Sequence, residues 1–195
     1  MSIIILLFAL TVWGVVHSIL ASHFAKDMIS LKLGSADYYR LAYNGFAGIS
    51  FLPILYLMRT LPDQKVYEVP SPWNLAMYGG QLLAIIFLTI AFLQTDSLSF
   101  IGVRQLFEKE KSGDLVTRGL YRVVRHPLYT FSLLFIWLTS TMTQNSLTVY
   151  TGATLYILIG TVFEERKLLR DFGEAYAEYK RKVPMLIPGF VFGRK

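Results

Sequence analysis

Runs of apolar residues alternate with polar segments along the chain, and charged residues occur only between and after the longest runs. These uncharged runs cover residues 3–21, 41–58, 73–93, 127–142 and 146–163. Because a helix rises 1.5 Å per residue, roughly 20 residues cross ~30 Å of hydrocarbon; most of the runs approach that length, and 127–142 is short. The pattern predicts an all-α, polytopic integral membrane protein with about five transmembrane helices.

The polar segments add three expectations. The connection 59–72 contains three prolines and predicts an extended loop. The long connection 94–126 ends before Pro127, which suits the first turn of a helix because its missing N–H has no helical partner there. Residues 164–182 are charged, with apolar positions at three- and four-residue spacing, and predict a cytosolic amphipathic C-terminal helix on the membrane surface.

Composition and charge agree with a membrane location. Apolar residues make up 54% of the chain, mean hydropathy is +0.46 and the net charge is +6. With five spans, every lysine and arginine except Arg59 and Lys65 falls on one side, which predicts an external N-terminus and a cytoplasmic C-terminus. The basic excess is explained by anionic membrane lipid, so we expect no nucleic-acid partner. The oligomeric state is not predicted.

Several kinds of chemistry are excluded or not indicated. The chain has no cysteine, which excludes disulfides, thiolate nucleophiles and cysteine-based metal or iron–sulfur sites. G-x-G-x-x-G, the P-loop and G-x-S-x-G are also missing, so neither a nucleotide-binding loop nor a hydrolase elbow is indicated. No pair or cluster of histidines has metal-binding spacing, and no metal is expected.

Charged residues are predicted to converge where the last two runs meet the cytosol. Arg125 and His126 precede the fourth run, and Glu164 and Glu165 follow the fifth. Only residues 143–145 separate these runs, so they should form an antiparallel helical hairpin. Ionisable residues that meet at a membrane boundary define a candidate functional site.

Three polar residues are expected at a similar depth: His17 in the first run, Asn44 in the second and Gln94 after the third. His17 and Asn44 also have a plain structural interpretation. A histidine on an apolar helix is more often a hydrogen-bonded packing residue than a ligand, and an asparagine can bond a neighbouring helix. An arginine at the interface can extend toward water, and the acidic pair can be solvated. The hypothesis therefore rests on their convergence.

The motifs around this predicted site resemble a known family. Residues 115–129 read LVTRGLYRVVRHPLY; Glu164-Glu165, the sequence FGEAYAEY at 172–179 and Val183-Pro184 follow. This arrangement resembles the signature of the isoprenylcysteine carboxyl methyltransferase superfamily, LV-x-x-G-x-Y-x-x-x-RHP-x-Y followed by an acidic pair and FG-x-x-Y-x-x-Y. The finer texture is similar to the NnrU and methanethiol S-methyltransferase branch, in residues 17–22, 100–105, 141–143, 156–160 and 184–188.

The resemblance implies an S-adenosylmethionine-dependent membrane methyltransferase with its cofactor pocket at the cytosolic face. It implies one domain, with three N-terminal spans in residues 1–96 and a cofactor-binding core in 97–195. Carried over by position, the cofactor-binding residues are Gly113, Asp114, Leu115, Val116, Tyr121, His126, Pro127, Leu128, Tyr129 and Glu164. The proton acceptor is His126, Glu164 or Glu165, which the sequence does not distinguish. We expect His17 and Asn44 to bind the acceptor.

One position departs from the isoprenylcysteine enzymes. They carry an arginine four residues before the acidic pair, where this chain has Gly160. Without that guanidinium we expect a small thiol or compact apolar acceptor that enters from the lipid, rather than a prenylcysteine carboxylate. Methylation of a prenylcysteine or of a lipid is the alternative. A rival of another class is a non-enzymatic haem- or quinone-binding membrane subunit with His17 and His126 as axial ligands.

Overall fold

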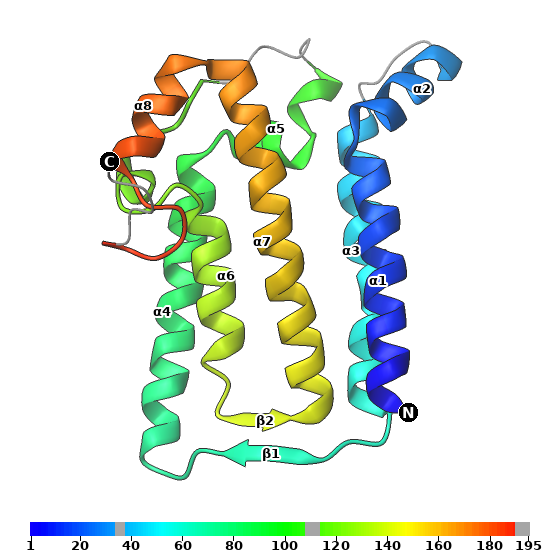
Figure 1. Cartoon of the computed structure of the whole chain (residues 1–195), viewed down its shortest axis with the longest axis vertical. Coiled ribbons are helices and arrows are strands. Elements are labelled where there is room, and N and C mark those ends of the chain that lie inside the picture. Colours follow the sequence, from blue (N-terminus) through cyan, green and yellow to red (C-terminus); the bar gives the residue numbers. More distant parts are fainter. Residues whose placement is uncertain (34–37, 108–113, 190–195) are drawn as a thin grey trace. The chain divides into compact units, whose positions relative to one another are not determined.

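The computed structural model describes residues 1–33, 38–107 and 114–189, and it is almost entirely helical (Figure 1). Two short strands pair in a two-stranded sheet. In chain order the elements are α1 (Ser2–Ala21), α2 (His23–Leu33), α3 (Tyr39–Thr60), β1 (Lys65–Glu68), α4 (Trp73–Gln94), α5 (Ser97–Ile101), the 3₁₀ helices η1 (Arg104–Leu106) and η2 (Gly119–Arg122), α6 (Pro127–Trp137), β2 (Thr141–Thr143), α7 (Gln144–Phe172) and α8 (Glu174–Lys182).

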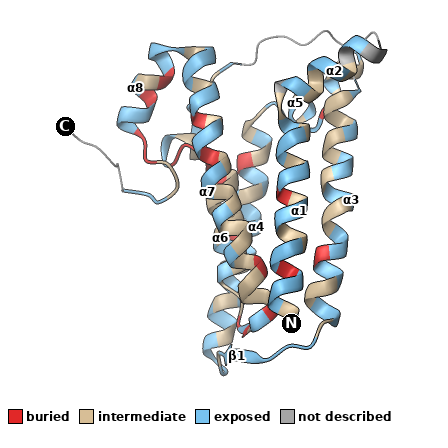
Figure 2. Cartoon of the chain, turned by 45° about the vertical axis from the view of Figure 1, so that its right-hand side comes forward, coloured by how far each residue is buried: buried red, intermediate tan, exposed pale blue. Residues whose placement is uncertain are grey.

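Four helices of the described chain are long and apolar enough to cross a membrane: α1, α3, α4 and α7. Many residues along these helices are exposed, as the pale blue stretches of ribbon in Figure 2 indicate. Among the large apolar side chains, Phe8 and Ile49 are each 70% exposed and Leu93 is 69% exposed. Exposing this much apolar surface to water costs free energy, and contact with membrane lipid removes that cost. The predicted all-α integral membrane class is confirmed.

The fourth predicted run forms a shorter helix than its length allows. Helix α6 begins at Pro127, as expected, but ends at Trp137, and β2 follows after three further residues. Its 11 residues rise only about 16 Å. It packs antiparallel on α4, where Phe131 stacks on Phe87 at 5.1 Å and the Phe135 carbonyl accepts a 3.0 Å bond from Gln81.

The chain divides into two compact units. The first comprises Met1–Val66, Asp96–Ser112 and Thr143–Gly152; the second comprises Tyr67–Thr95, Gly113–Met142 and Ala153–Lys195. In the first unit α1 packs on α3 around Leu6, Ile54 and Val149. The sequence-based division at residue 96, into N-terminal spans and a cofactor-binding core, stays a prediction.

The amphipathic helix expected over 164–182 is not continuous. Residues 164–172 extend α7, and Gly173, with φ +54°, separates them from α8. The interruption falls at a glycine because L side chains disfavour that backbone conformation. The expected helix boundary was therefore wrong, and Glu164 and Glu165 lie inside α7. On α8, Tyr176 and Tyr179 are buried against Val183, so this helix packs against protein.

Candidate active site

The centre of the second unit is a buried ion pair between Arg125 and Glu165. The Arg125 side chain donates from Nε and Nη2 to Oε1 of Glu165, at 2.7 and 2.5 Å. Both side chains are only 7% exposed, and the ammonium of Lys180 lies 2.7 Å from the other carboxylate oxygen. Because two cations engage both oxygens of Glu165, this carboxylate is held as a structural anchor.

Arg125 also fixes the segment that follows α8. Its Nη1 donates to the carbonyls of Lys180 and Val183, at 3.1 and 2.5 Å. The backbone N–H groups of Arg125 and His126 donate to the carbonyls of Pro184 and Met185. Residues far apart in sequence thus lock the entry to α6, and the position of His126, onto the C-terminal segment. Arg125 is 8% exposed, which rules out the solvent-reaching interpretation of this side chain.

His126 and Glu164 lie beside this anchor. The His126 ring is 6% exposed and stacks on the Tyr129 ring, with centroids 5.6 Å apart. Its Nδ1 lies 3.7 Å from Oε2 of Glu164, and the Tyr129 hydroxyl donates to the same oxygen at 2.9 Å. The Glu164 side chain is 42% exposed. The group therefore combines a buried imidazole with a carboxylate that a ligand can reach.

The buried face of His126 is incompletely satisfied. Its Nε2 lies 3.4 Å from Oε1 of Glu165 but makes no hydrogen bond within the described structure. Buried polar atoms normally have a partner, so an exception requires an explanation, and a role in catalysis or ligand binding is one. The Tyr176 hydroxyl, on α8, is a second buried polar atom without a hydrogen bond among the described residues.

The predicted hairpin explains how these residues meet. Helices α6 and α7 run antiparallel (Figure 1), and a hydrogen bond joins them near each end. Tyr129 bonds Glu164 at one end, and the Trp137 indole donates to Thr154 at the other, at 3.0 Å. Residues 35 positions apart are thereby brought into contact.

The remaining predicted cofactor residues lie in the segment before α6 and in the first turn of α6, except that Gly113 lies outside the described residues. Asp114 is exposed and Val116 is half-buried, whereas Leu115 packs against the buried cluster of Tyr176, Tyr179 and Val183. Pro127 is fully buried and Leu128 is half-buried in the first turn of α6.

Tyr121 lies within electrostatic range of Glu164. Burial raises its pKa to about 12, and the negative charge of Glu164 contributes in the same direction. The phenol therefore remains a neutral hydrogen-bonding group at physiological pH. Its backbone carbonyl accepts a 2.6 Å bond from the Tyr179 hydroxyl, so α8 supports this turn as well.

Gln94, at the end of α4, positions the turn that leads to Tyr121. Its amide oxygen accepts a 2.8 Å bond from the backbone N–H of Leu120. Gly119, with φ +62°, lies so close that a Cβ there would overlap the Gln94 amide group. The sequence identified Gln94 only as a polar residue at the right depth; its role as a clamp was not predicted, because nothing local marks which turn it meets.

His17 and Asn44 belong to the first unit and have partners within it. The Tyr43 hydroxyl lies 2.7 Å from Nε2 of His17, whose ring also stacks on Trp13. The Asn44 amide donates to the carbonyls of Phe100 and Ile101, at 3.0 and 2.8 Å, at the end of α5. These contacts correspond to the packing interpretations; binding of an acceptor by either residue stays a prediction.

Fold and site together define a membrane-embedded helical protein with an ionisable cluster between the start of α6 and the interior of α7. Comparison with known proteins identifies the class. Residues 75–175 match the family model described as phospholipid methyltransferase. No solved structure matches the chain.

Curated relatives agree with that match. A methanethiol S-methyltransferase from Pseudomonas deceptionensis is 30% identical over 190 residues, covering 92% of this chain and 70% of the relative. Its counterpart from Mycobacterium tuberculosis is 30% identical over 198 residues, covering 96% and 78%. A protein-S-isoprenylcysteine O-methyltransferase from Schizosaccharomyces pombe is 36% identical over 149 residues, covering 72% and 60%.

The chain belongs to the phospholipid methyltransferase family and is an integral membrane methyltransferase. The resemblance read from the RHP motif and the acidic pair is thereby confirmed. Membership of a methyltransferase family favours the enzymatic prediction over the haem- or quinone-binding subunit. A methyltransferase also requires a methyl donor.

Proposed function

We propose that the protein uses S-adenosylmethionine to methylate the sulfur of a small thiol at the cytosolic membrane face. The observation that carries the proposal is the group of His126, Tyr129 and Glu164, built on the motif that the chain shares with the family. The names of the methanethiol-methylating relatives support the thiol as acceptor.

The residues of the site fit such a cofactor. Bound S-adenosylmethionine would supply a methyl group on a cationic sulfur, already activated for transfer. Glu164 offers a partly exposed carboxylate to the cationic part of that ligand, and Tyr121 and Tyr129 offer aromatic rings. The first turn of α6 has N–H groups without helical acceptors, which favours a ligand carboxylate nearby. The buried, unbonded Nε2 of His126 provides a further polar contact.

The protein's main tasks are then positioning, exclusion of water and management of one proton. Methyl transfer would form a bond between the acceptor sulfur and the methyl carbon, in line with the breaking bond between that carbon and the sulfur of the donor. The thiolate is the reactive form, so the acceptor's proton must leave. Among the three predicted acceptors of that proton, Glu164 and His126 keep atoms that can receive it, whereas Arg125 and Lys180 occupy both oxygens of Glu165.

Gly160 supports a compact acceptor without a carboxylate. It lies on α7, one turn before Glu164, and a Cβ added there would meet no atom within 4 Å. The position is therefore open and carries no cation to pair with a prenylcysteine carboxylate. The second candidate function is prenylcysteine methylation, which the similarity to the Schizosaccharomyces pombe enzyme supports.

Transfer of a labelled methyl group tests both functions. Purified wild-type protein should methylate a methanethiol-like thiol and leave a farnesylated cysteine analogue unmodified. Turnover of the farnesylated analogue alone would replace the thiol by the prenylcysteine as acceptor. Gly160→Arg is a companion variant: because the position is open, we expect it to fold correctly and to gain activity on the carboxylate acceptor only.

A further inference from the structure

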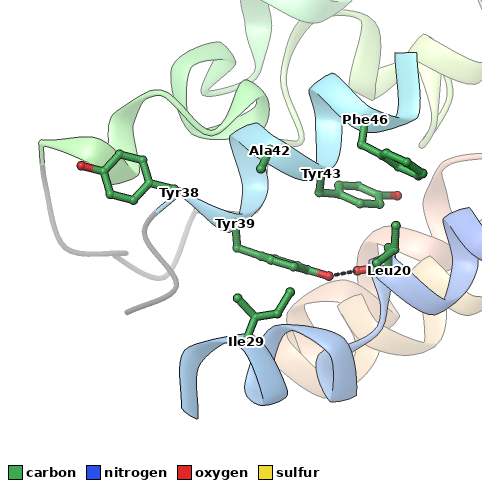
Figure 3. Close-up of a pocket in the computed structure, with 7 residues that line it drawn as sticks. All are labelled: Leu20, Ile29, Tyr38, Tyr39, Ala42, Tyr43 and Phe46. Atoms are coloured by element: carbon green, nitrogen blue, oxygen red, sulfur yellow. Dashed lines mark hydrogen bonds between the residues drawn. The ribbon is translucent and has the colours of Figure 1, made fainter. Parts of the chain in front are cut away.

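The first unit contains an apolar pocket that the proposed methyl transfer does not use. It has a volume of about 590 Å³ and lies between the end of α1, helix α2 and the first two turns of α3 (Figure 3). Leu20, Ile29 and Phe46 contribute aliphatic and aromatic carbon, and three tyrosines complete most of the wall. Pockets of this size hold ligands far larger than a small thiol.

The pocket offers almost no free polar group to a ligand. The Tyr39 hydroxyl donates to the carbonyl of Leu20, and the Tyr43 hydroxyl bonds His17. Figure 3 shows the Tyr39 ring extending from α3 toward Leu20 of α1, with Ile29 of α2 between this ring and the α2 backbone. Because these hydroxyls are engaged, the interior presents mainly hydrocarbon and ring surface, and the part of a ligand that enters it must be apolar.

The position of the pocket identifies where such a ligand comes from. Helix α1 ends at Ala21 and α3 begins at Tyr39, and both helices qualify as membrane spans. The pocket thus lies at the level where hydrocarbon gives way to headgroups, a level at which tyrosine is enriched. On α2, Phe24 and Leu31 are 69% and 85% exposed, and Tyr38 of the lining is 69% exposed, as expected of a surface that contacts lipid.

Basic residues adjoin the lining. Lys26 precedes Ile29 by three positions on α2 and so lies on the same side of that helix. Arg40 follows Tyr39 directly and donates to the carbonyl of Ser99. This end of α1 and α3 also belongs to the side predicted to face the anionic cytoplasmic leaflet. A cation beside an apolar slot suits an amphiphile with a negative headgroup.

We propose that this pocket binds one acyl chain of an anionic phospholipid, with the phosphate-bearing headgroup beside Lys26. The pocket belongs to the first unit and the His126–Glu164 group to the second, and the proposal does not depend on the proposed methyl transfer. Its occupant would fix α2 against α1 and α3, whose mutual packing otherwise leaves the space open.

Native mass spectrometry of the full chain in an uncharged detergent tests the proposal, with phosphatidylglycerol and phosphatidylcholine of identical acyl chains as probes. Wild-type protein should retain one phosphatidylglycerol and hold it more tightly than phosphatidylcholine. Ile29→Trp, which fills the pocket, should weaken retention by about tenfold or more. Leu31→Trp, on the same helix but outside the lining, should stay within about twofold of wild type.

The headgroup is tested separately. Lys26→Gln should reduce the preference for phosphatidylglycerol, whereas Lys65→Gln, on the exposed strand β1, should not. Thermal unfolding of each variant verifies that it is folded. Undiminished retention by a folded Ile29→Trp variant would overturn the pocket assignment, and equal affinity of wild type for both lipids would overturn the anionic headgroup. A loss of oligomeric mass in Ile29→Trp, without any retained lipid, would make a second copy of the chain the occupant.

Discussion

In both sequence pairs, Arg125-His126 and Glu164-Glu165, the two adjacent residues have different environments, which indicates a structural role for one residue and a functional role for the other. Arg125 and Glu165 are buried, and their charges are matched by each other, by Lys180 and by backbone carbonyls. Their sequence neighbours differ: His126 keeps a buried nitrogen without a hydrogen bond among the described residues, and Glu164 keeps a carboxylate that is 42% exposed. We therefore assign a structural role to Arg125 and Glu165, and we propose that His126 and Glu164 contact the cofactor.

Replacement of Glu164 or His126 tests that assignment. Glu164→Gln and His126→Ala should each weaken S-adenosylmethionine binding by at least about tenfold, which corresponds to ~1.4 kcal/mol. Titration calorimetry in detergent provides the affinities. Glu174→Gln is the matched control, because this carboxylate on α8 is 79% exposed and pairs only at the surface with Arg181. Normal binding by both site variants would mean that the pocket lies elsewhere.

The ion pair predicts a different phenotype. Arg125→Met leaves Glu165 buried with a single cation, so the free energy of unfolding should fall by about 3–5 kcal/mol. Lys180→Met should cost less than about 1 kcal/mol, because the lysine is 48% exposed. The double variant Arg125→Met, Glu165→Leu should recover much of the loss. Unfolding titrations compare the three, and equal stability of Arg125→Met and Lys180→Met would contradict the anchoring role.

At the scale of elements, the site depends on short irregular segments held by long helices. The turn before Tyr121 is clamped by Gln94 of α4, and the segment after α8 is bonded to the entry of α6. The turn is the four-residue 3₁₀ helix η2, and the described residues after Val183 form no helix or strand. Their positions therefore depend on a few long-range contacts, which makes them sensitive to substitutions at those contacts.

Gly119→Ala tests the clamp. The alanine backbone would have to adopt the left-handed conformation of Gly119, at a cost of about 1–2 kcal/mol. Its methyl group would also displace the Gln94 amide. We expect lower stability and weaker cofactor binding, measured by thermal unfolding and calorimetry. Gly79→Ala on α4 is the control, since its Cβ would meet nothing within 4 Å; it should be neutral or stabilise by roughly 0.5–1 kcal/mol. A Gly119→Ala variant indistinguishable from this control would refute the clamp.

Elements with strong local signals were predictable from the sequence. Uncharged runs identified α1, α3, α4 and α7, and Pro127 identified the start of α6. The interruption at Gly173 was missed because the apolar spacing continues across it, and only the backbone conformation reveals the change of direction.

Long-range pairing was less accessible. The predicted topology places the basic residues Arg125 and His126 near the two glutamates. Nothing in the sequence showed that Arg125 pairs with Glu165, that Tyr129 bonds Glu164, or that His126 lies near both carboxylates. Adjacent residues on a helix point in directions about 100° apart, so which neighbour each meets is decided by packing.

For the whole molecule, the number of membrane crossings depends on α6. Although the helix is short, the segment that contains it follows nearly the full length of α4: Leu120 bonds Gln94 at one end, and Ser140 bonds Tyr78 and Val69 at the other. The extended residues after Trp137 thus complete the passage that the helix begins, which favours five crossings.

Five crossings place the two ends of the chain on opposite sides. With the basic connections inside, the N-terminus should be external and the C-terminus cytosolic. Reporter fusions at each end measure this directly, with a fusion in the β1 connection expected to report the external side. If both ends report the cytosol, the segment around α6 does not cross.

The decisive experiment is calorimetric titration of the wild-type protein with S-adenosylmethionine, and with S-adenosylhomocysteine as competitor. We expect saturable binding of one cofactor per chain, displaced by the competitor. Absence of any binding by folded protein would contradict the assignment of the His126–Glu164 group as the site that holds the methyl donor.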